Sequence, residues 1–306
     1  MYKKKSNILY IYRDNEKWFN MRSLALFLLA LAAGYTAVRA TTVKVKDVPK
    51  PFDLKLANES IYLVQAVLCE SSTFASRTYL GASAGFRYKA TIHDEKTDTN
   101  GFIGVLDEKI FVVYRGTSSK LDWMDDAEAW QDPAEYSECK DCLIHHGFNK
   151  CIDNTIKDVL TALESLRKEH PTFPIVCVGH SLGGALTNLA AIELISAGFT
   201  NVLHYSFGSP RVGNAAWADY SNKVIPHAQR ITHYKDSVPH VPPTTIPLVA
   251  HYQHILSEVY EDEHHVLHGC VGIDDQSCCM QWGSFETSPS DHNLYLDVPT
   301  TCPDNL

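Results

Sequence analysis

The stretch at residues 175–184 constrains the fold more than any other part of the chain. It reads IVCVGHSLGG, in which four apolar residues precede a serine that is framed by glycines. Consecutive apolar residues without alternation are typical of a parallel strand that is covered on both faces. The largely apolar run after Ser181 ends at Gly198, which predicts a buried helix that stops there. We therefore expect a strand, a sharp turn that carries Ser181, and a helix.

This order of elements is the one that a nucleophile elbow requires, because its strained turn lifts a serine hydroxyl clear of the sheet near a helix N-terminus. The Gly-x-Ser-x-Gly pattern alone is weak, since the chain repeats it around Ser83. Polar residues precede Ser83 and a strand-like run comes after it, so we reject Ser83 as a nucleophile. For Ser181 the alternative is a glycine-rich turn whose serine has no catalytic role.

Alternating strands and helices predict one α/β domain with a mostly parallel sheet flanked by helices. The chain has 306 residues, of which 45% are hydrophobic, enough for a sizeable core. The expected strands are 88–92, 102–106, 109–115, 175–178, 202–207 and 230–234, and the expected helices include 53–68 and a stretch around 156–166. The net charge of −9 argues against nucleic acid as a partner.

The N-terminal region has the features of a secretion signal. Its apolar run at 24–33 spans about ten residues, too few to cross a bilayer as a helix. Arg22 precedes the run, and Val38-Arg39-Ala40 offers a cleavage pattern. We expect residues 1–40 to be the signal region, with Met21 as an alternative start, and residues 41–306 to form a secreted domain without a stable membrane anchor. An uncleaved signal anchor is the alternative.

Nine cysteines in a secreted chain predict disulfides with at least one free thiol. Cys177, inside the buried strand, is the first candidate for the free thiol. Cys139 and Cys142 are expected to form a local bridge.

Two further local patterns concern glycosylation and metal binding. Asn58 begins the acceptor sequence for N-glycosylation, which implies an exposed position if it is used. His264, His265, His268 and Cys270 could be metal ligands, but their spacing fits no standard site. We therefore expect neither a metal nor another cofactor.

A serine hydroxyl becomes a nucleophile when a histidine takes its proton and a carboxylate orients that histidine. In α/β-hydrolase order the acid and then the histidine come after the serine. Asp236 fits because it lies just after a predicted strand, although spacing alone favours it only weakly over its neighbours. Composition selects no particular histidine.

Four motifs resemble the fungal class 3 lipases, the Rhizomucor-type triacylglycerol lipases. They are GHSLGG at 179–184, GSPRVGN at 208–214, DSVPHVPP at 236–243 and DHNLY at 291–295. The resemblance covers roughly residues 56–302 with the motifs in family order. It implies an α/β-hydrolase fold with Ser181 as nucleophile, Asp236 as orienting acid and His292 as general base and acid.

The resemblance also implies an oxyanion hole and a disulfide pattern. The oxyanion donors would be the Leu182 N–H together with the N–H and hydroxyl of Thr117. The implied disulfides join Cys69 with Cys302, and Cys270 with Cys279 or, as the alternative, Cys278.

The implied function is that of a secreted, monomeric triacylglycerol lipase that hydrolyses acylglycerols at an oil–water interface through an acyl-enzyme. A feruloyl or other soluble-ester esterase would share these catalytic residues. A non-catalytic lipid-binding relative typically lacks a triad member, whereas all three are present here.

In the resembling lipases, the stretch at 118–130 is a short helical lid over the active site. Leu121 and Met124 are three residues apart and share one helix face, and Trp123 adjoins them. The resemblance implies that Asp126 hydrogen-bonds the Thr117 hydroxyl when the lid opens. The alternative is a surface helix that never moves.

If residues 118–130 form a lid, activity against tributyrin should rise abruptly as its concentration passes the solubility limit, because the apolar face then turns toward the oil. Trp123→Ala should reduce this jump. Rates measured on both sides of the limit test the expectation. Smooth saturation through the limit, unchanged by Trp123→Ala, would show that the segment is only a loop.

Overall fold

The computed structural model describes residues 13–14, 17–18, 43–48, 51–116 and 130–303. The chain divides into two units, Met1–Thr42 and Val43–Leu306. In the first unit, the short strands β1 (Arg13–Asp14) and β2 (Lys17–Trp18) pair antiparallel. The apolar run and the cleavage pattern of the expected signal region lie outside the described residues. All four family motifs lie in the second unit.

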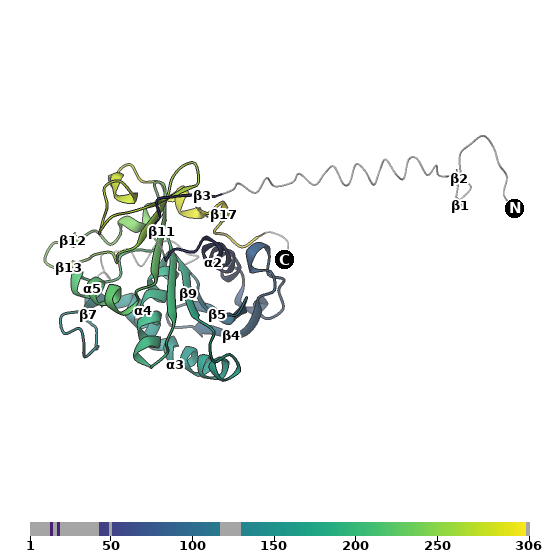
Figure 1. Cartoon of the computed structure of the whole chain (residues 1–306), viewed down its shortest axis with the longest axis horizontal. Coiled ribbons are helices and arrows are strands. Elements are labelled where there is room, and N and C mark those ends of the chain that lie inside the picture. The colour runs from purple at the N-terminus through teal and green to yellow at the C-terminus, as the bar shows by residue number, and fades with distance from the viewer. Residues whose placement is uncertain (1–12, 15–16, 19–42, 49–50, 117–129, 304–306) are drawn as a thin grey trace. The chain divides into compact units, whose positions relative to one another are not determined.

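The second unit is built on a nine-stranded sheet in the order β3-β15-β14-β11-β10-β9-β6-β5-β4 (Figure 1). Parallel pairs join β6, β9, β10, β11 and β14 in the middle. The pairs β14–β15, β5–β6 and β4–β5 are antiparallel, and the edge strand β3 pairs parallel with β15. The strands of this sheet are β3 (Lys44–Lys46), β4 (Arg87–Asp94), β5 (Thr99–Leu106), β6 (Lys109–Tyr114), β9 (Ile175–His180), β10 (Val202–Phe207), β11 (Ala228–His233), β14 (Glu258–Glu261) and β15 (Val266–Gly269).

Helices cover both faces of the sheet. Helix α2 (Leu54–Val67) packs on one face, and α3 (His146–Glu169), α4 (Leu182–Ser196) and α5 (Ala215–Val224) pack on the other. Short elements complete the unit. They are η1 (Ser71–Thr73), η2 (Gly81–Ser83), β7 (Gln131–Pro133), β8 (Leu143–His145), η4 (Val238–His240), β12 (Thr245–Ile246), β13 (Ala250–His251), η5 (Cys279–Gln281), η6 (Pro289–Asn293), β16 (Leu294–Tyr295) and β17 (Val298–Pro299).

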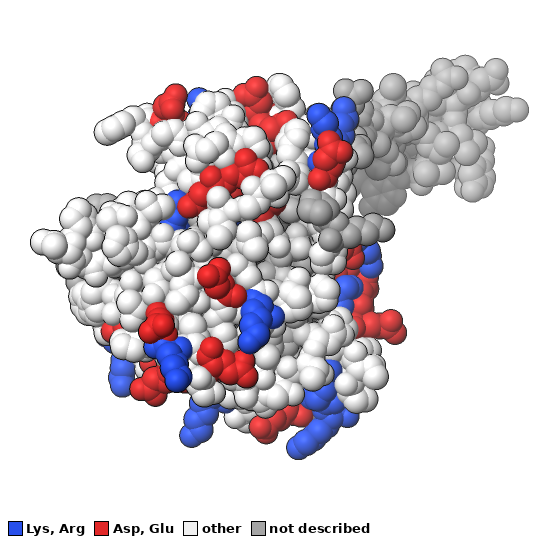
Figure 2. Space-filling view, turned by 60° about the vertical axis from the view of Figure 1, so that its left-hand side comes forward, with Lys and Arg blue, Asp and Glu red and all other residues white. Residues whose placement is uncertain are grey.

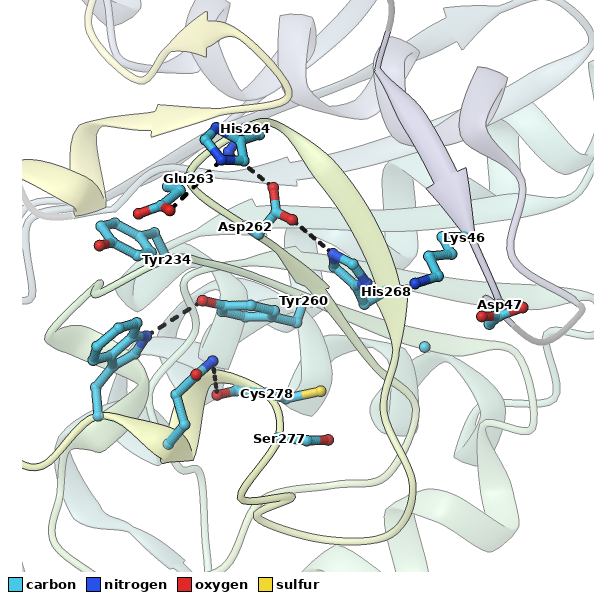
Figure 3. Close-up of a pocket in the computed structure, with 13 residues that line it drawn as sticks. Lys46, Asp47, Tyr234, Tyr260, Asp262, Glu263, His264, His268, Ser277 and Cys278 are labelled. Atoms are coloured by element: carbon cyan, nitrogen blue, oxygen red, sulfur yellow. Dashed lines mark hydrogen bonds and ion pairs between the residues drawn. The ribbon is translucent and has the colours of Figure 1, made fainter.

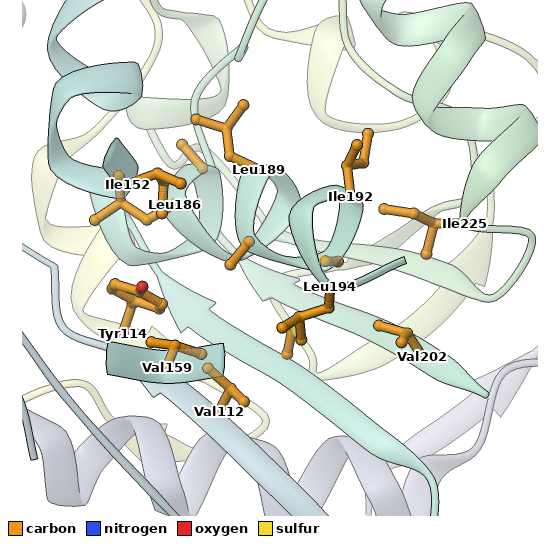
Figure 4. Close-up of a cluster of buried hydrophobic side chains, with 14 of the residues drawn as sticks. Val112, Tyr114, Ile152, Val159, Leu186, Leu189, Ile192, Leu194, Val202 and Ile225 are labelled. Atoms are coloured by element: carbon orange, nitrogen blue, oxygen red, sulfur yellow. The ribbon is translucent and has the colours of Figure 1, made fainter. Parts of the chain in front are cut away.

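Side chains of strand β9 belong to both hydrophobic clusters, one on each face of the sheet. Ile175 and Cys177 belong to the cluster beneath α4, whereas Val176 and Val178 belong to the cluster beneath α2. Successive side chains of a strand point to opposite faces, so a strand covered on both sides must be apolar at every position. Figure 4 shows Leu186, Leu189 and other residues of α4 packed over the sheet.

The expected strand, turn and helix around Ser181 are present, and α4 ends beside Gly198 with φ +91°. The rejected Ser83 lies in the 3-10 helix η2, with β4 after it. Helix α5 and the strands β14 and β15 were not expected from the sequence. The fold is the α/β-hydrolase type that the motifs implied.

The cysteine pattern needs one correction. Cys69 bonds Cys302 and Cys139 bonds Cys142, but Cys270 bonds Cys278, so the expected pairing with Cys279 is wrong. Cys279 begins the turn of η5 and is 1% exposed, and its backbone N–H donates to Glu258 Oε1 at 3.2 Å. Adjacent residues of a turn point in different directions, so only Cys278 reaches Cys270. Cys177 is free, as expected, together with Cys151 and Cys279.

Two surface features bear on the expectations. Asn58 lies within α2 with intermediate exposure and Ser60 is buried, and glycosylation at Asn58 stays a prediction. On the face shown in Figure 2, most basic side chains lie beside acidic ones. Among the described helices, none has both the length and the apolar character to cross a bilayer.

Removing the Cys69–Cys302 disulfide should destabilise the fold more than removing Cys139–Cys142. The first closes a loop with a sequence separation of 233, the second one of 3. In the chain-entropy model the long loop contributes up to about 5 kcal/mol and the short one about 2 kcal/mol. Thermal unfolding of the two double Cys→Ala variants, without reductant, measures the difference. Equal losses in Tm would contradict the loop-length explanation.

Candidate active site

Ser181 lies on a strained turn between β9 and α4. Its backbone has φ 57° and ψ −133°, which a non-glycine residue rarely adopts. Such strain costs on the order of 1–3 kcal/mol and persists only where the surroundings hold it. Here the Ser181 N–H donates to Phe207 O at 2.9 Å, and the Ser181 carbonyl accepts from Gly184 N–H at 2.9 Å. The turn is therefore fixed to both the neighbouring strand and the helix.

Close backbone contact around the turn explains its glycines. A Cβ at Gly183 would collide with the carbonyl of Tyr114 at the end of β6. A Cβ at Gly116 would lie 2.9 Å from His180 O and 3.1 Å from the Ser181 Cβ. The chain that leaves β6 thus passes directly beside Ser181. Thr117, the next residue, lies outside the described residues.

Asp236 and His292 come together from two different segments. Asp236 comes just after β11, and His292 lies in the 3-10 helix η6 near the C-terminus. His292 Nδ1 donates to Asp236 Oδ2 at 2.7 Å, and the Val238 N–H donates to Asp236 Oδ1 at 2.8 Å. Asp236 is 1% exposed, so its carboxylate depends on these donors.

Tyr295 is a further partner of this carboxylate. Its buried hydroxyl donates to Asp236 Oδ2 at 2.5 Å. Burial, then the adjacent Asp236 carboxylate, raises the pKa of Tyr295 well above its usual value, so the hydroxyl keeps its proton. Asp236 Oδ2 therefore holds both the Tyr295 hydroxyl and the His292 ring.

His180, the residue before the serine, holds the backbone of His292. Its Nε2 donates to His292 O at 2.8 Å, and the two rings have centroids 4.2 Å apart. Burial, then the nearby His292 ring, lowers the pKa of His180 well below its usual value. A neutral His180 places no second positive charge beside His292 when that ring takes up a proton.

Gly208, at the end of β10, brings the serine strand and the acid–histidine pair together. Its φ is +54°, and a Cβ there would lie 2.6 Å from Asp236 Oδ2 and 2.9 Å from His292 Nδ1. Only glycine leaves room for the pair at this position. Because Phe207 accepts the Ser181 N–H, the same strand end contacts all three expected triad residues or their backbone.

The two remaining features of the site concern proton transfer and charge stabilisation. His292 Nε2 is buried and has no hydrogen-bond partner among the described residues. The Leu182 N–H belongs to the first residue of α4, where helix N–H groups have no partner within the helix. The lid residues Leu121, Trp123, Met124 and Asp126 lie outside the described residues.

Sequence reasoning missed the supporting roles of Tyr295, His180 and Gly208. Each belongs to a motif that carried the family resemblance, but their contacts to Asp236 and His292 join segments far apart in sequence. No local pattern reports such contacts.

A separate hollow lies beyond this site (Figure 3). Its volume is about 510 Å³, and the residues that line it come from the ends of β3, β11 and β14, from β15, and from the loop at 270–282. It includes Tyr234, Tyr260, Trp282, Asp262 and His268, but none of Ser181, Asp236 and His292. Its polar groups partner one another: His268 donates to Asp262 at 2.8 Å and the Trp282 ring donates to the Tyr260 hydroxyl at 3.3 Å.

Comparison with known proteins agrees with this geometry. A family model described as Lipase (class 3) matches residues 111–246. A protein named Secreted mono- and diacylglycerol lipase 2, from Gibberella zeae, is 36% identical over 157 residues, covering 46% of this chain and 38% of the relative. A protein named Lipase, from Rhizopus oryzae, is 29% identical over 208 residues, covering 66% of this chain and 52% of the relative. The chain thus spans about half or less of the length of these relatives.

Solved structures extend the likeness over most of the domain. The structure titled Rhizomucor miehei lipase propeptide complex, native, is 25% identical, with a TM-score of 0.70, covering 81% of this chain and 83% of that chain. Lipase II from Rhizopus niveus is also 25% identical with a TM-score of 0.70, covering 80% of this chain and 94% of that chain.

The sheet order and the serine turn define an α/β hydrolase. Within that class, residues 111–246 match the class 3 lipase family model, and the relatives and solved structures similar to this chain are lipases.

Tyr295→Phe should lower kcat by about tenfold with little change in KM, because Asp236 loses a donor that fixes it against His292. Tyr205→Phe is the matched control. The buried Tyr205 hydroxyl accepts the Asp53 N–H at 3.1 Å, and this hydrogen bond involves none of the triad residues. Steady-state kinetics on a soluble ester and thermal unfolding separate the effects. Equal kcat losses in both variants would mean that Tyr295 acts only on stability.

Proposed function

We propose that the chain is a secreted serine carboxylic ester hydrolase that acts on acylglycerols, with Ser181, Asp236 and His292 as its catalytic triad. The observation that carries the proposal is the strained Ser181 turn beside a buried Asp236–His292 pair. Serine, acid and histidine occur in the order expected of this fold. The match of residues 111–246 to the class 3 lipase family model supports the same function.

The arrangement supports acyl transfer in two steps. Ser181 Oγ attacks the ester carbonyl, and its proton passes to His292 Nε2, the buried ring nitrogen opposite the one that contacts Asp236. His292 then protonates the leaving alcohol, and an acyl-enzyme remains. Water attacks it with His292 again as base, which releases the fatty acid and restores Ser181.

The oxyanion formed in each step needs donors aimed at it. The Leu182 N–H, at the N-terminus of α4, suits this role. Thr117 would supply the second donor, directly after Gly116, which lies against Ser181. Each preorganised donor contributes about 3 kcal/mol to stabilisation of the transition state.

The proposed location and state are extracellular and monomeric. Three disulfides support an oxidising compartment, and the Gibberella zeae relative is named a secreted lipase. The apolar run at 24–33 and the cleavage pattern after it would direct export.

Ser181→Ala should lower the hydrolysis of a short-chain chromogenic ester by roughly 10⁶-fold, because triad members act as a unit. The fold should persist, since only one hydroxyl is lost. Ser83→Ala is the matched control in the second Gly-x-Ser-x-Gly pattern; its hydroxyl donates to Leu80 O at 2.8 Å and lies in another element. Activity retained in Ser181→Ala would reject the proposed nucleophile.

A substrate panel distinguishes the enzyme classes. Emulsified mono-, di- and triolein should be hydrolysed faster than methyl ferulate, as expected of an acylglycerol lipase. The opposite preference would indicate a feruloyl esterase with the same triad. No turnover of any ester by folded protein would indicate a non-catalytic lipid-binding relative.

A further inference from the structure

Two histidines and a glutamate outside the triad meet at one end of the sheet. His233 ends β11 and Glu261 ends β14, and they face each other in the parallel ladder between these strands. His265 lies in the turn that leads to β15. One ring nitrogen of each histidine and a carboxylate oxygen of Glu261 all lie within 4.8 Å of one another. Three metal-ligating side chains from separate segments thus converge on one point.

The hydrogen bond of His233 leaves its other ring nitrogen free for a metal. His233 Nδ1 lies 2.9 Å from Asp291 O, and a carbonyl oxygen only accepts, so the proton of a neutral ring is on Nδ1. Nε2 then carries a lone pair. Histidines that bind metals almost always donate their other N–H to a carbonyl or carboxylate in this way.

The Glu261 carboxylate is held in place by hydrogen bonds, as a ligating carboxylate usually is. It is fully buried, and both of its oxygens accept from the Leu296 N–H, at 2.9 and 3.0 Å. His265 Nδ1 lies 2.7 Å from Glu261 Oε1, and among the described residues this histidine is its ion-pair partner. A buried carboxylate needs a positive partner, and a metal ion would supply that charge.

We propose that His233 Nε2, Glu261 and His265 Nδ1 bind a divalent transition metal of the zinc type, with water as the fourth ligand. Two imidazoles and one carboxylate are a known ligand set for zinc, whereas Mg²⁺ and Ca²⁺ prefer oxygen ligands throughout. The ion takes the place of the proton between His265 and Glu261, and that proton is released to solvent. The side chain of His265 is 21% exposed, which gives the ion a path from solvent.

The site is distinct from the other histidines of the same hairpin. His264 and His268 line the hollow in Figure 3, where His268 donates to Asp262 Oδ2 at 2.8 Å. Another group of possible ligands, Glu258, Cys270 and Cys278, is unsuitable because its two cysteines form a disulfide. Only one histidine of the 264–268 run therefore joins the proposed site, which explains why ligand spacing in the sequence did not reveal it.

The expected role of the metal is structural. The groups that support its ligands are Asp291 O and the Leu296 N–H, which stand on either side of His292 and Tyr295 in the sequence. A metal bound to His233 and Glu261 fixes β11 and β14 to that segment. It lies outside the triad and takes no part in ester hydrolysis.

The test uses the full chain after treatment with a chelator. Calorimetric titration with Zn²⁺ should show one equivalent bound, and saturating Zn²⁺ should raise Tm by roughly 5–10 °C. Mg²⁺ should do neither. His265→Ala should weaken Zn²⁺ binding at least tenfold and remove the rise in Tm. His268→Ala, on the same hairpin but paired with Asp262, should bind as the wild type does.

Absence of Zn²⁺ binding in the wild type, or equal binding in His265→Ala, overturns the proposal. Loss of binding in His268→Ala alone also overturns it, because the metal would then occupy the hollow of Figure 3. If His265→Ala does not fold, the visible absorption of wild-type chain loaded with Co²⁺ decides. Strong d–d bands of a four-coordinate site support the proposal, and the weak bands of hydrated Co²⁺ reject it.

Discussion

The site depends on the close approach of β6, β9 and α4 at the Ser181 turn. A side chain at Gly183 would strike the backbone of Tyr114, so the helix starts against the strand only because glycine is there. That contact forces Ser181 into its left-handed conformation, which Phe207 O and Gly184 N–H then hold. The neighbouring strands β6 and β10 are parallel to β9, so their carboxyl ends meet at the same edge. Gly116 and Gly208, which follow β6 and β10, therefore lie near Ser181 as a consequence of the parallel strand order.

His292 presents a different problem, because it lies on a 3-10 helix near the C-terminus instead of on a long element. Its backbone carbonyl accepts from His180 Nε2 at 2.8 Å and from the Thr300 hydroxyl at 3.2 Å. The Tyr295 hydroxyl fixes the chain on one side, and the Cys69–Cys302 disulfide ties its end to the turn just after α2. Many separate contacts thus replace the rigidity that a helix would have given. These contacts together determine the position of His292 relative to Asp236.

The sequence predicts the parts of this structure in which local pattern and tertiary role agree. Strand β9 and helix α4 are apolar because both are buried, and the hairpin strands β4, β5 and β6 are predicted by their apolar runs and turns. Strand β14 was missed because its sequence, EVYE, begins and ends with a charge. Both charged side chains are buried, and each has a partner there: Glu258 pairs with Arg230, and Glu261 accepts the Leu296 N–H. His292 was predicted only by family resemblance, because its partners are remote in sequence.

The buried Arg230–Glu258 pair shows why such charges persist in a core. Arg230 Nη2 lies 2.6 Å from Glu258 Oε2, and the side chains of both residues are at most 2% exposed. Desolvation makes such a pair weak evidence for stability, but it constrains register. Arg230 faces Glu258 across the ladder, while Ile231 and Val259 face the α2 layer. A slip of β11 by one residue would push the Arg230 guanidinium into that apolar layer. The pair thereby fixes the register at which β11 ends on His233 and delivers Asp236 to His292.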